Sequence, residues 1–326
     1  MGAPLVSEDE FIELWNTHKS AKRVAEAVGV DVANVHRRRR NLERKRGIKL
    51  DSHYQNSHCY THLQTYGRHK ERQELGILDG QIIVFSDAHF WPGIRTTAYR
   101  GLVHLIRELQ PKAVINNGDS FDGASISRFP RIGWDQTPSI IEELKANELA
   151  LGEIENTAKA ARANVKLVWC LGNHDARFEN RLAANAPQYE KVHGFSLKDH
   201  FPAWQPCWAT WNQGTVIKHR YKGGIHAAHN NTVNSGVNIV TGHLHSLKVT
   251  PFDDYNGTRY GVDTGTLAEP TGPQFSNYLE ESPTNWRSGF IVLTYHDGKL
   301  LWPEVVKVWD TGFIEFRGQI IDVRQA

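Results

Sequence analysis

The sequence predicts an α/β protein whose layered body follows a small helical module. Three observations lead to this prediction: strand and helix patterns alternate from Gly80 onward, hairpin signals follow in the last third of the chain, and three short helical patterns precede the body. With 326 residues, 40% of them apolar, the chain can build one large core and a small second one. We expect a module over 1–49, a linker over 50–79 and the α/β body over 80–326.

Three short helices are expected in the module. Ser7 and Glu10 form a capping-box pattern that opens a helix running to about His18. A second helix is expected between Ser20 and Gly29, where the glycine begins a tight turn into a basic third helix. A glycine turn between a second helix and a basic third one is typical of a helix-turn-helix DNA-binding module.

The positive charge of the chain is concentrated on this third helix. The net charge is +2, yet residues 1–50 hold 11 Lys/Arg against 7 Asp/Glu. Val32, Val35 and Leu42 form an apolar stripe, and the basic side chains lie away from it. We therefore predict DNA as a partner, with a solvated basic helix that only aids solubility as the alternative. The predicted DNA-contacting residues are Asn34, Arg37, Arg38, Arg40 and Arg44.

Residues 50–79 are polar and weakly periodic, which indicates a surface linker. Several histidines and a cysteine lie in this segment, but their spacing fits no standard zinc finger. A linker is therefore the preferred interpretation, and a zinc site is the alternative. The residues concerned are His53, His58, Cys59, His62 and His69.

The body shows the alternation most clearly. Apolar runs predict its strands, amphipathic periodicity predicts its helices, and Asn256-Gly257 marks a hairpin. The expected strands are 81–85, 113–115, 165–169, 215–218, 237–240 and 259–262; the expected helices are 97–109 and 137–163; and 289–322 is strand-rich.

Membrane and secretory classes are not indicated. No apolar run reaches the roughly 18 residues of a membrane helix, and the N-terminus lacks the pattern of a secretory signal. Three cysteines are too few for a disulfide framework. We expect a cytoplasmic protein with no membrane partner, and the sequence indicates nothing about protein partners.

Five polar clusters each follow a predicted strand, so they can meet at the carboxyl ends of the sheet. Together they offer two aspartates, one asparagine and four histidines as metal donors, a mixed set that suits divalent ions such as Mn, Fe or Zn. This set fills two sites if one carboxylate is shared, and two metals about 3.5–4 Å apart are a standard device for phosphoryl displacement. The clusters are Asp87-x-His89, Gly118-Asp119, Gly172-Asn173-His174-Asp175, His219 and Gly242-His243-Leu244-His245.

In order and spacing, these clusters resemble the signature of the calcineurin-like metallophosphoesterases. The resemblance implies a four-layer α/β/β/α sandwich with two mixed sheets and a metal-dependent phosphoric ester hydrolase. It also implies two divalent metal ions, with manganese favoured and Fe, Zn, Ni or Mg as alternatives. The nucleophile would be a hydroxide that bridges the two metals.

The resemblance also implies which residues hold the metals. Three would ligate the first metal, one would bridge both, and three would ligate the second. In that order they are Asp87, His89 and His245; Asp119; and Asn173, His219 and His243.

The fourth motif leaves a choice between histidines. His219 directly follows a predicted strand, where a ligand is expected, and it is preferred. His226 and His229 come later in the chain and are the alternatives, with hydrogen-bonded or substrate-facing roles otherwise.

Two further residues resemble the family's catalytic groups. His174 matches the histidine that protonates the leaving oxygen, and Asp122 matches the carboxylate that orients it. Arg177 and Arg128 are candidates for gripping a phosphate oxygen. Trp91 is a candidate, together with Trp134, for flanking the cleft.

Two features favour a particular substrate. The segment Gly118-Asp-Ser-Phe-Asp-Gly123 lacks the arginine of the GDxVDRG pattern of serine/threonine phosphatases, and Asp175 replaces the glutamate of their GNHE pattern. The predicted DNA-binding module would concentrate the site near DNA. In having such an N-terminal module, the chain resembles phage-encoded members of the superfamily. We therefore predict a DNA-directed phosphodiesterase or nuclease. The alternatives are a phosphomonoesterase acting on nucleotides or proteins, and a DNA-binding regulator whose body senses a ligand.

Overall fold

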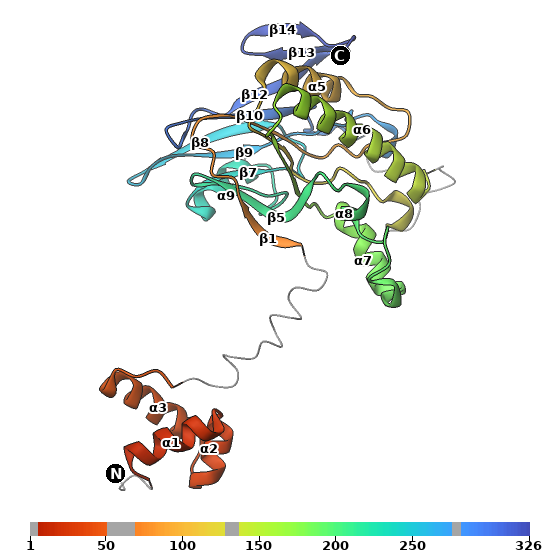
Figure 1. Ribbon diagram of the computed structural model, residues 1–326. Helices are drawn as coiled ribbons and strands as arrows, with labels where there is room; N and C mark the ends of the chain where they lie inside the picture. The colour runs from red at the N-terminus through yellow and green to blue at the C-terminus, as the bar shows by residue number, and fades with distance from the viewer. Residues whose placement is uncertain (1–5, 51–68, 128–136, 276–281) are drawn as a thin grey trace. The chain divides into compact units, whose positions relative to one another are not determined.

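The computed structural model (Figure 1) divides into two compact units, Met1–Arg68 and His69–Ala326. The zinc-site candidates from His53 to His62 lie outside the described residues. Among the helices that are described, none is long and apolar enough to cross a membrane. The described residues are 6–50, 69–127, 137–275 and 282–326.

The first unit consists of three helices with the predicted caps. The hydroxyl of Ser7 accepts a hydrogen bond from the Glu10 amide at 3.2 Å, and the Glu10 carboxylate accepts one from the Ser7 amide at 2.9 Å. This reciprocal pair satisfies amides that the first helical turn leaves unpaired. Gly29 ends the second helix in the left-handed region, at φ 70°. The helices are α1 (Glu8–His18), α2 (Ala21–Val28) and α3 (Val32–Arg46).

A small apolar core holds these helices together. Phe11 and Trp15 of α1 are buried against Val24 of α2 and against Val35 and Leu42 of α3. These side chains repeat at helical spacing, so each helix buries one stripe. Val32, which the sequence places on this stripe, is 38% exposed because it lies in the first turn of α3.

The second unit is built on one mixed sheet. In the described part of the chain, fourteen strands belong to one hydrogen-bonded sheet instead of the two sheets that were predicted, and twelve of them form a continuous path. The path stays continuous because β5 and β6 pair antiparallel through Thr210 and Ile217. The main order is β14-β13-β12-β10-β2-β3-β4-β5-β6-β7-β9-β8, with β1 beside β5 and β11 beside β10. The strands are β1 (Lys70–Glu74), β2 (Gly80–Phe85), β3 (Ala113–Asn116), β4 (Lys166–Cys170), β5 (Gln205–Asn212), β6 (Thr215–Ile217), β7 (Asn238–Thr241), β8 (Lys248–Asp254), β9 (Gly257–Asp263), β10 (Gly289–His296), β11 (Lys299–Leu300), β12 (Glu304–Asp310), β13 (Phe313–Phe316) and β14 (Gln319–Asp322).

The two faces of the central strands bury different cores. Along β2, Ile83 and Phe85 pack into the core beneath the helices, while Ile82 and Val84 point to the opposite face. That second face shares its core with Val262 of β9, so the two halves of the sheet pack against each other. The mixed α/β sandwich is therefore present, with both halves joined by hydrogen bonds.

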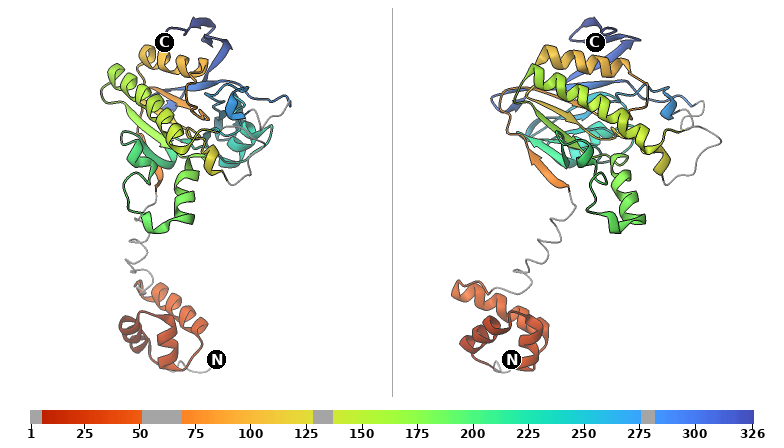
Figure 2. Two further views of the ribbon diagram at one scale, coloured as in Figure 1. Left: turned by 90° about the vertical axis from the view of Figure 1, so that its right-hand side faces the viewer. Right: turned by 45° about the vertical axis from the view of Figure 1, so that its right-hand side comes forward.

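Helices cover the outer faces of this sandwich. α5 and α6 lie side by side over one face, as Figures 1 and 2 show, and α9 packs on β7, β8 and β9 of the other half. The resulting layers are α/β/β/α. The helices are α5 (Thr97–Leu109), α6 (Ile140–Ala161), α7 (Asp175–Asn185), α8 (Leu197–His200) and α9 (Ala227–Ser235), with short 3₁₀ turns at Ala124–Ile126, Pro187–Tyr189 and Pro273–Phe275.

The end of the predicted linker differs from expectation. Lys70–Glu74 forms β1, which pairs in parallel with β5, and Leu75 and Ile77 are buried in the core of the sandwich. The polar sequence of β1 lacks the alternation that predicts strands, and its pairing comes from the neighbouring edge of β5. His69, the last zinc-site candidate, instead lies 2.7 Å from Glu179 of α7.

Candidate metal centre and active site

The five polar clusters gather at the carboxyl ends of the central strands. Asp87 and His89 follow β2, Asp119 follows β3, and Asn173 follows β4. β2, β3 and β4 are neighbouring parallel strands, so their carboxyl ends share one edge of the sheet. From the other half of the sandwich, residues that follow β6 and β7 complete the set: His219, His243 and His245.

The first predicted metal group is assembled. Asp87, His89 and His245 each place one donor atom within 4.8 Å of the other two. The closest pair is His245 Nε2 and Asp87 Oδ1, 3.1 Å apart, and all three side chains are buried. These are the residues that the sequence assigns to the first metal.

The second predicted group lies beside it. Asp119, His219 and His243 also place their donor atoms within 4.8 Å of one another. His219 Nε2 is 3.0 Å from Asp119 Oδ2, and the His219 ring is fixed by Nδ1, which lies 2.8 Å from the backbone oxygen of Asn117. Because an imidazole held through one nitrogen presents the other, Nε2 is oriented toward the centre.

The three candidate histidines of the fourth motif differ in burial. His219 is buried against Asp119, whereas His226 and His229 are exposed at the start of α9. His229 stacks edge-on against Phe252, with ring centroids 5.7 Å apart. The geometry therefore agrees with the preference for His219.

The centre contains buried donor atoms that have no hydrogen-bond partner. They are His89 Nε2 and Asn173 Oδ1; His219 Nε2 lies 3.0 Å from Asp119 Oδ2 but without hydrogen-bond geometry. Leaving a buried polar atom unpaired is costly, so several together at one point indicate a missing ligand. Nitrogen and oxygen donors around two buried carboxylates fit divalent metal ions, and the residues present are thus suited to hold them.

Burial and charge act in opposite directions on His219. Burial favours its neutral form, but the carboxylates of Asp119 and Asp87 outweigh that effect and raise the pKa of His219 to about 10. A metal that binds His219 must therefore displace a proton, so binding weakens as the pH falls.

Asp122 connects the first metal group to His174. Its Oδ1 is 2.8 Å from His89 Nδ1 and 3.0 Å from His174 Nδ1. Burial alone would raise the pKa of Asp122, but the hydrogen bonds and charges of His174 and His89 hold it well below its usual range. One carboxylate therefore orients both rings and leaves each Nε2 directed elsewhere.

His174 and Arg177 lie together at the edge of the centre. Burial lowers the pKa of His174, yet the charge of Asp119 and the contact with Asp122 raise it overall. Arg177 donates from Nη1 to the backbone oxygen of Asp122 at 2.9 Å, and its Nη2 is 3.0 Å from His174 Nε2. Arg128, the other phosphate candidate, lies outside the described residues, as does Trp134.

The glycines of the motifs leave room for the ligands. A Cβ on Gly172 would overlap Asp119 Oδ1, and one on Gly118 would lie 2.5 Å from His219 Nδ1. At Gly242 a Cβ would lie 2.5 Å from the Ser86 hydroxyl. Glycine is therefore required because other side chains pass through the space where a Cβ would be.

The ligand loops are bent into an uncommon backbone conformation. Five of the seven predicted ligands have positive φ, the left-handed region that L-residues seldom adopt. Residues held there cost free energy that the surrounding structure must offset, which is typical of functional sites. These residues are Asp87 (52°), His89 (39°), Asp119 (52°), His243 (74°) and His245 (56°).

Asp175 is a structural residue of the site to which the sequence gives no role. Its buried carboxylate accepts hydrogen bonds from the amides of Asp119 and Gly172, at 2.9 and 2.8 Å, and from the Trp169 indole at 3.0 Å. Two more amides, of Ser120 and Phe121, also donate to it. Asp175 thus ties the loop after β3 to the loop after β4. The only sequence signal was its position directly after His174.

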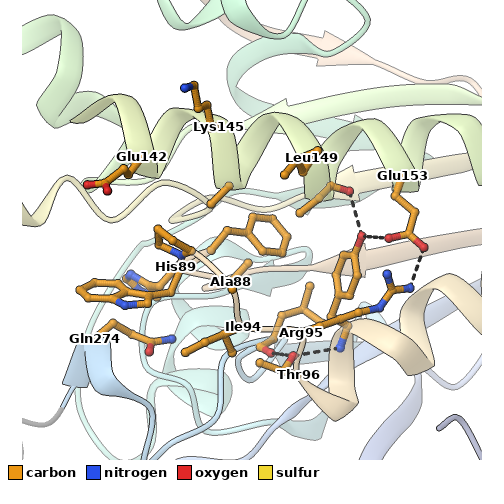
Figure 3. A pocket seen from close by; sticks show the side chains of 18 residues that line it. Ala88, His89, Ile94, Arg95, Thr96, Glu142, Lys145, Leu149, Glu153 and Gln274 are labelled. Atoms are coloured by element: carbon orange, nitrogen blue, oxygen red, sulfur yellow. Dashed lines mark hydrogen bonds and ion pairs between the residues drawn. The ribbon is translucent and has the colours of Figure 1, made fainter. Parts of the chain in front are cut away.

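A cavity of 410 Å³ opens beside His89, between the loop after β2 and α6. In Figure 3, Ile94 and Leu149 border it, and Arg95 and Glu153 form an ion pair at 2.6 Å. Trp91, the other cleft candidate, also lines this cavity. The side chains around it are mainly apolar, with charged groups at its rim.

The predicted DNA-contacting residues of α3 are not equivalent. Arg38 folds back onto α1: it donates to the backbone oxygens of Val6 and Ser7 and lies over the Phe11 ring, 5.0 Å from its centroid. This differs from the expected outward orientation, because α1 offers carbonyl acceptors and an aromatic face within reach. Asn34, Arg37, Arg40 and Arg44 are exposed.

A sandwich with two adjoining metal-ligand groups at its strand ends defines a dimetal phosphoesterase. The calcineurin-like phosphoesterase family profile matches residues 80–264. The chain therefore belongs to the calcineurin-like phosphoesterase family, and it is a metal-dependent phosphoester hydrolase.

Comparison with individual proteins adds less. No curated protein matches the chain. A solved structure, the crystal structure of a dimetal phosphatase from Danio rerio, is similar over 76% of this chain and 99% of that chain, with 10% identity and a TM-score of 0.33. A similarity at that TM-score indicates nothing about the substrate of this chain.

Proposed function

We propose that this enzyme is a DNA-directed phosphodiesterase or nuclease. The observation that carries the proposal is the combination, in one chain, of a phosphoesterase site with a helix-turn-helix-like module whose third helix has an exposed basic face. Arg37, Arg40 and Arg44 recur at helical spacing on that face, opposite the buried Val35 and Leu42.

The arginines of this face differ from their neighbours in what they contact. Lys45 and Arg46 are paired with Glu8 of α1, at 2.8 and 2.9 Å, so the unit itself neutralises part of their charge. Among described residues, Arg40 and Arg44 have no acidic partner, and Arg37 contacts only Asn34, at 2.6 Å. Unpaired arginines along one helix face suit the phosphates and base edges of a duplex.

The catalytic centre supports hydrolysis of a phosphodiester. Two divalent ions held by the seven ligands would supply the Lewis acidity that activates water and offsets phosphate charge; we propose manganese as the ion. His174, with its raised pKa, can donate the proton at Nε2 to the leaving oxygen, and Asp122 fixes its orientation through Nδ1. Loss of that proton transfer would matter most for poor leaving groups such as a deoxyribose oxygen.

The contact between Arg177 and His174 also suits a phosphate. When His174 is protonated, Nη2 of Arg177 and Nε2 of His174 are both donors, although they lie 3.0 Å apart. A phosphate whose leaving oxygen accepts from His174 and whose non-bridging oxygen accepts from Arg177 would relieve this conflict. We therefore assign Arg177 to binding a non-bridging oxygen of the scissile phosphate.

We also propose a cytoplasmic location. Cys170 and Cys207 lie on neighbouring strands with their sulfur atoms 3.9 Å apart, and both are free thiols in the core. Closely spaced free thiols are compatible with a reducing compartment.

The proposal is tested by hydrolysis assays on purified protein that has been stripped of metal and reloaded with manganese. An aryl phosphodiester, an aryl phosphomonoester and end-labelled duplex DNA are compared. We expect turnover of the diester and of DNA. Hydrolysis of the monoester alone would identify a phosphomonoesterase, and DNA binding without metal-dependent hydrolysis of any substrate would identify a regulator.

A variant that lacks residues 1–49 separates the roles of the two units. We expect it to hydrolyse the aryl diester at the rate of the full chain but to bind DNA more weakly, with a shallower dependence on salt because fewer phosphates are contacted. Unchanged DNA affinity in this variant would remove the module from the proposal.

A further inference from the structure

A second cavity, of 460 Å³, begins at the predicted metal ligand Asn173. Along one face of α7 it is lined by residues three and four apart, among them Arg177 and Arg181, and Arg220 contributes from the loop after β6. We call this cavity the arginine pocket. It is lined by Ile126, Asn173, Arg177, Asn180, Arg181, Ala184 and Arg220.

The charges in the arginine pocket are unbalanced. Three guanidinium groups line it, and none of the carboxylates that the structure describes does. Within the described part of the chain, neither Arg181 nor Arg220 forms an ion pair, and both are exposed. This distinguishes them from Arg259 and Arg317, which are paired with Asp254 and Glu304 at 2.6 Å. A concave surface with one sign of charge attracts ions of the opposite sign.

The chemistry of the lining points to phosphate. Guanidinium groups bind phosphate oxygens through two parallel N–H donors, and the amides of Asn173 and Asn180 add neutral polar groups. In the proposed function, the scissile phosphate is bound at the metal centre together with His174 and Arg177. Arg181 lies one helical turn beyond Arg177 and is thus placed for a different anionic group.

We propose that the arginine pocket binds the phosphate next to the scissile one, so that the enzyme recognises a chain of phosphodiesters. The volume of the pocket lies within the usual range for small-ligand sites and exceeds the size of one phosphate, which leaves room for part of a nucleotide. This inference rests on the proposed function, and it names Arg181 and Arg220 as residues that determine the preference for polynucleotides.

The test uses substrates that differ by one phosphate. The dinucleotide TpT has a single diester, whereas pTpT and TpTp carry an additional phosphate at the 5′ or the 3′ end. Affinities are measured by calorimetry on the manganese-loaded full-length His174→Ala variant, which slows turnover, and cleavage is measured with wild-type enzyme. We expect one of the longer compounds to bind roughly ten-fold more tightly than TpT.

Substitutions then identify the residues that cause the preference for the additional phosphate. Arg181→Ala should reduce the preference for the additional phosphate roughly three- to ten-fold, and the further change Arg220→Ala should bring it close to unity. Arg107→Ala is the matched control, because Arg107 is an exposed arginine at the end of α5 that lines a different cavity. Thermal unfolding and metal content verify that each variant is intact, and Arg181→Ala alone suffices if Arg220→Ala disturbs its neighbour His219.

The outcomes separate the two proposals. Equal affinity for all three dinucleotides, or a preference that Arg181→Ala and the control change alike, would overturn the arginine pocket. The enzyme could instead bind pTpT or TpTp tightly, lose that binding in Arg181→Ala, and cleave no nucleotide. That outcome would support the arginine pocket and overturn the DNA-directed function. Preference in both binding and cleavage supports both.

Discussion

The two units of this chain are held together over different ranges of sequence. Among the described residues of the N-terminal unit, the hydrogen bond that spans the most sequence joins Arg46 to Glu8, 38 residues apart, and the Ser7 capping contact spans only three residues. In the second unit, the site depends on pairs such as His245 and Asp87, which are 158 residues apart. The first unit can therefore be disrupted without altering the catalytic centre, whereas the centre requires most of the second unit. Four substitutions test this separation.

The largest effect is expected from Asp119→Asn. The buried carboxylate lies in the second ligand group and accepts a hydrogen bond from the His174 amide at 2.8 Å. Asp119 is the predicted shared ligand, so its loss should weaken both metals and reduce hydrolysis to background. DNA binding by the first unit should not change. Activity and metal content are measured together, with Asp254→Asn on the β8–β9 hairpin as control. Full metal content with normal turnover would exclude Asp119 as the shared ligand.

His174→Ala should leave the metals bound but slow turnover by about two to four orders of magnitude. The reason is the loss of the proton donor, so the deficit should be larger for an alkyl than for a nitrophenyl leaving group. Rates with both leaving groups are compared with those of His296→Ala, which changes a histidine whose side chain is 82% exposed. An equal deficit for the two leaving groups would contradict the role of His174 as acid.

Trp15→Ala should unfold the first unit alone. Trp15 is fully buried and stacks on Phe11, and truncating a buried tryptophan costs about 3–5 kcal/mol, a large share of the stability of so small a core. DNA binding should be lost while aryl diester hydrolysis persists. DNA affinity and hydrolysis are measured on the same preparation, with Ile48→Ala, at a 36% exposed site, as control. Loss of hydrolysis would show that the units depend on each other.

The smallest effect concerns pH. Glu143 of α6 is buried, and burial together with the charge of Asp122 raises its pKa to about 7, although the amides of Gly123 and Ala124 oppose this shift. Between about pH 4.5 and 7 the folded state keeps a proton that the unfolded chain releases, so the free energy of unfolding should fall as pH rises, by up to about 3 kcal/mol.

Glu143→Gln should remove that contribution. Chemical unfolding of metal-free protein at pH 5 and pH 8 measures it, and the loss of stability between the two pH values should be smaller in the variant than in the wild type. An equal loss in both proteins would show that Glu143 does not titrate in this window.

The sequence was most informative where a signal is local. The capping box at Ser7, the glycine after α2 and the limits of α5 depend on neighbouring residues, and the structure agrees with them. The convergence of the candidate ligands could be predicted because each motif directly follows a strand. The family match over 80–264 confirms the family that those motifs indicate.

The features that the sequence did not predict depend on contacts with residues far away in the sequence. β1 has no apolar alternation and becomes a strand because β5 offers an unpaired edge. Arg38 turns inward because α1 places two carbonyls and Phe11 beside it. Asp175 joins two loops through amides more than 50 residues away, and no pattern in one sequence encodes those bonds.

The overlap between Gly172 and Asp119 has a consequence for how such chains can diverge. Asp119 Oδ1 occupies the space where any other residue at position 172 would place its Cβ. Even alanine there would push the shared carboxylate out of line with His219, although alanine is the smallest possible change. A relative that carries a side chain at this position must therefore have moved its strand loops or given up this arrangement of ligands. In such a chain, the absence of this one glycine would indicate that metal-dependent hydrolysis has been lost even where every ligand residue is still present.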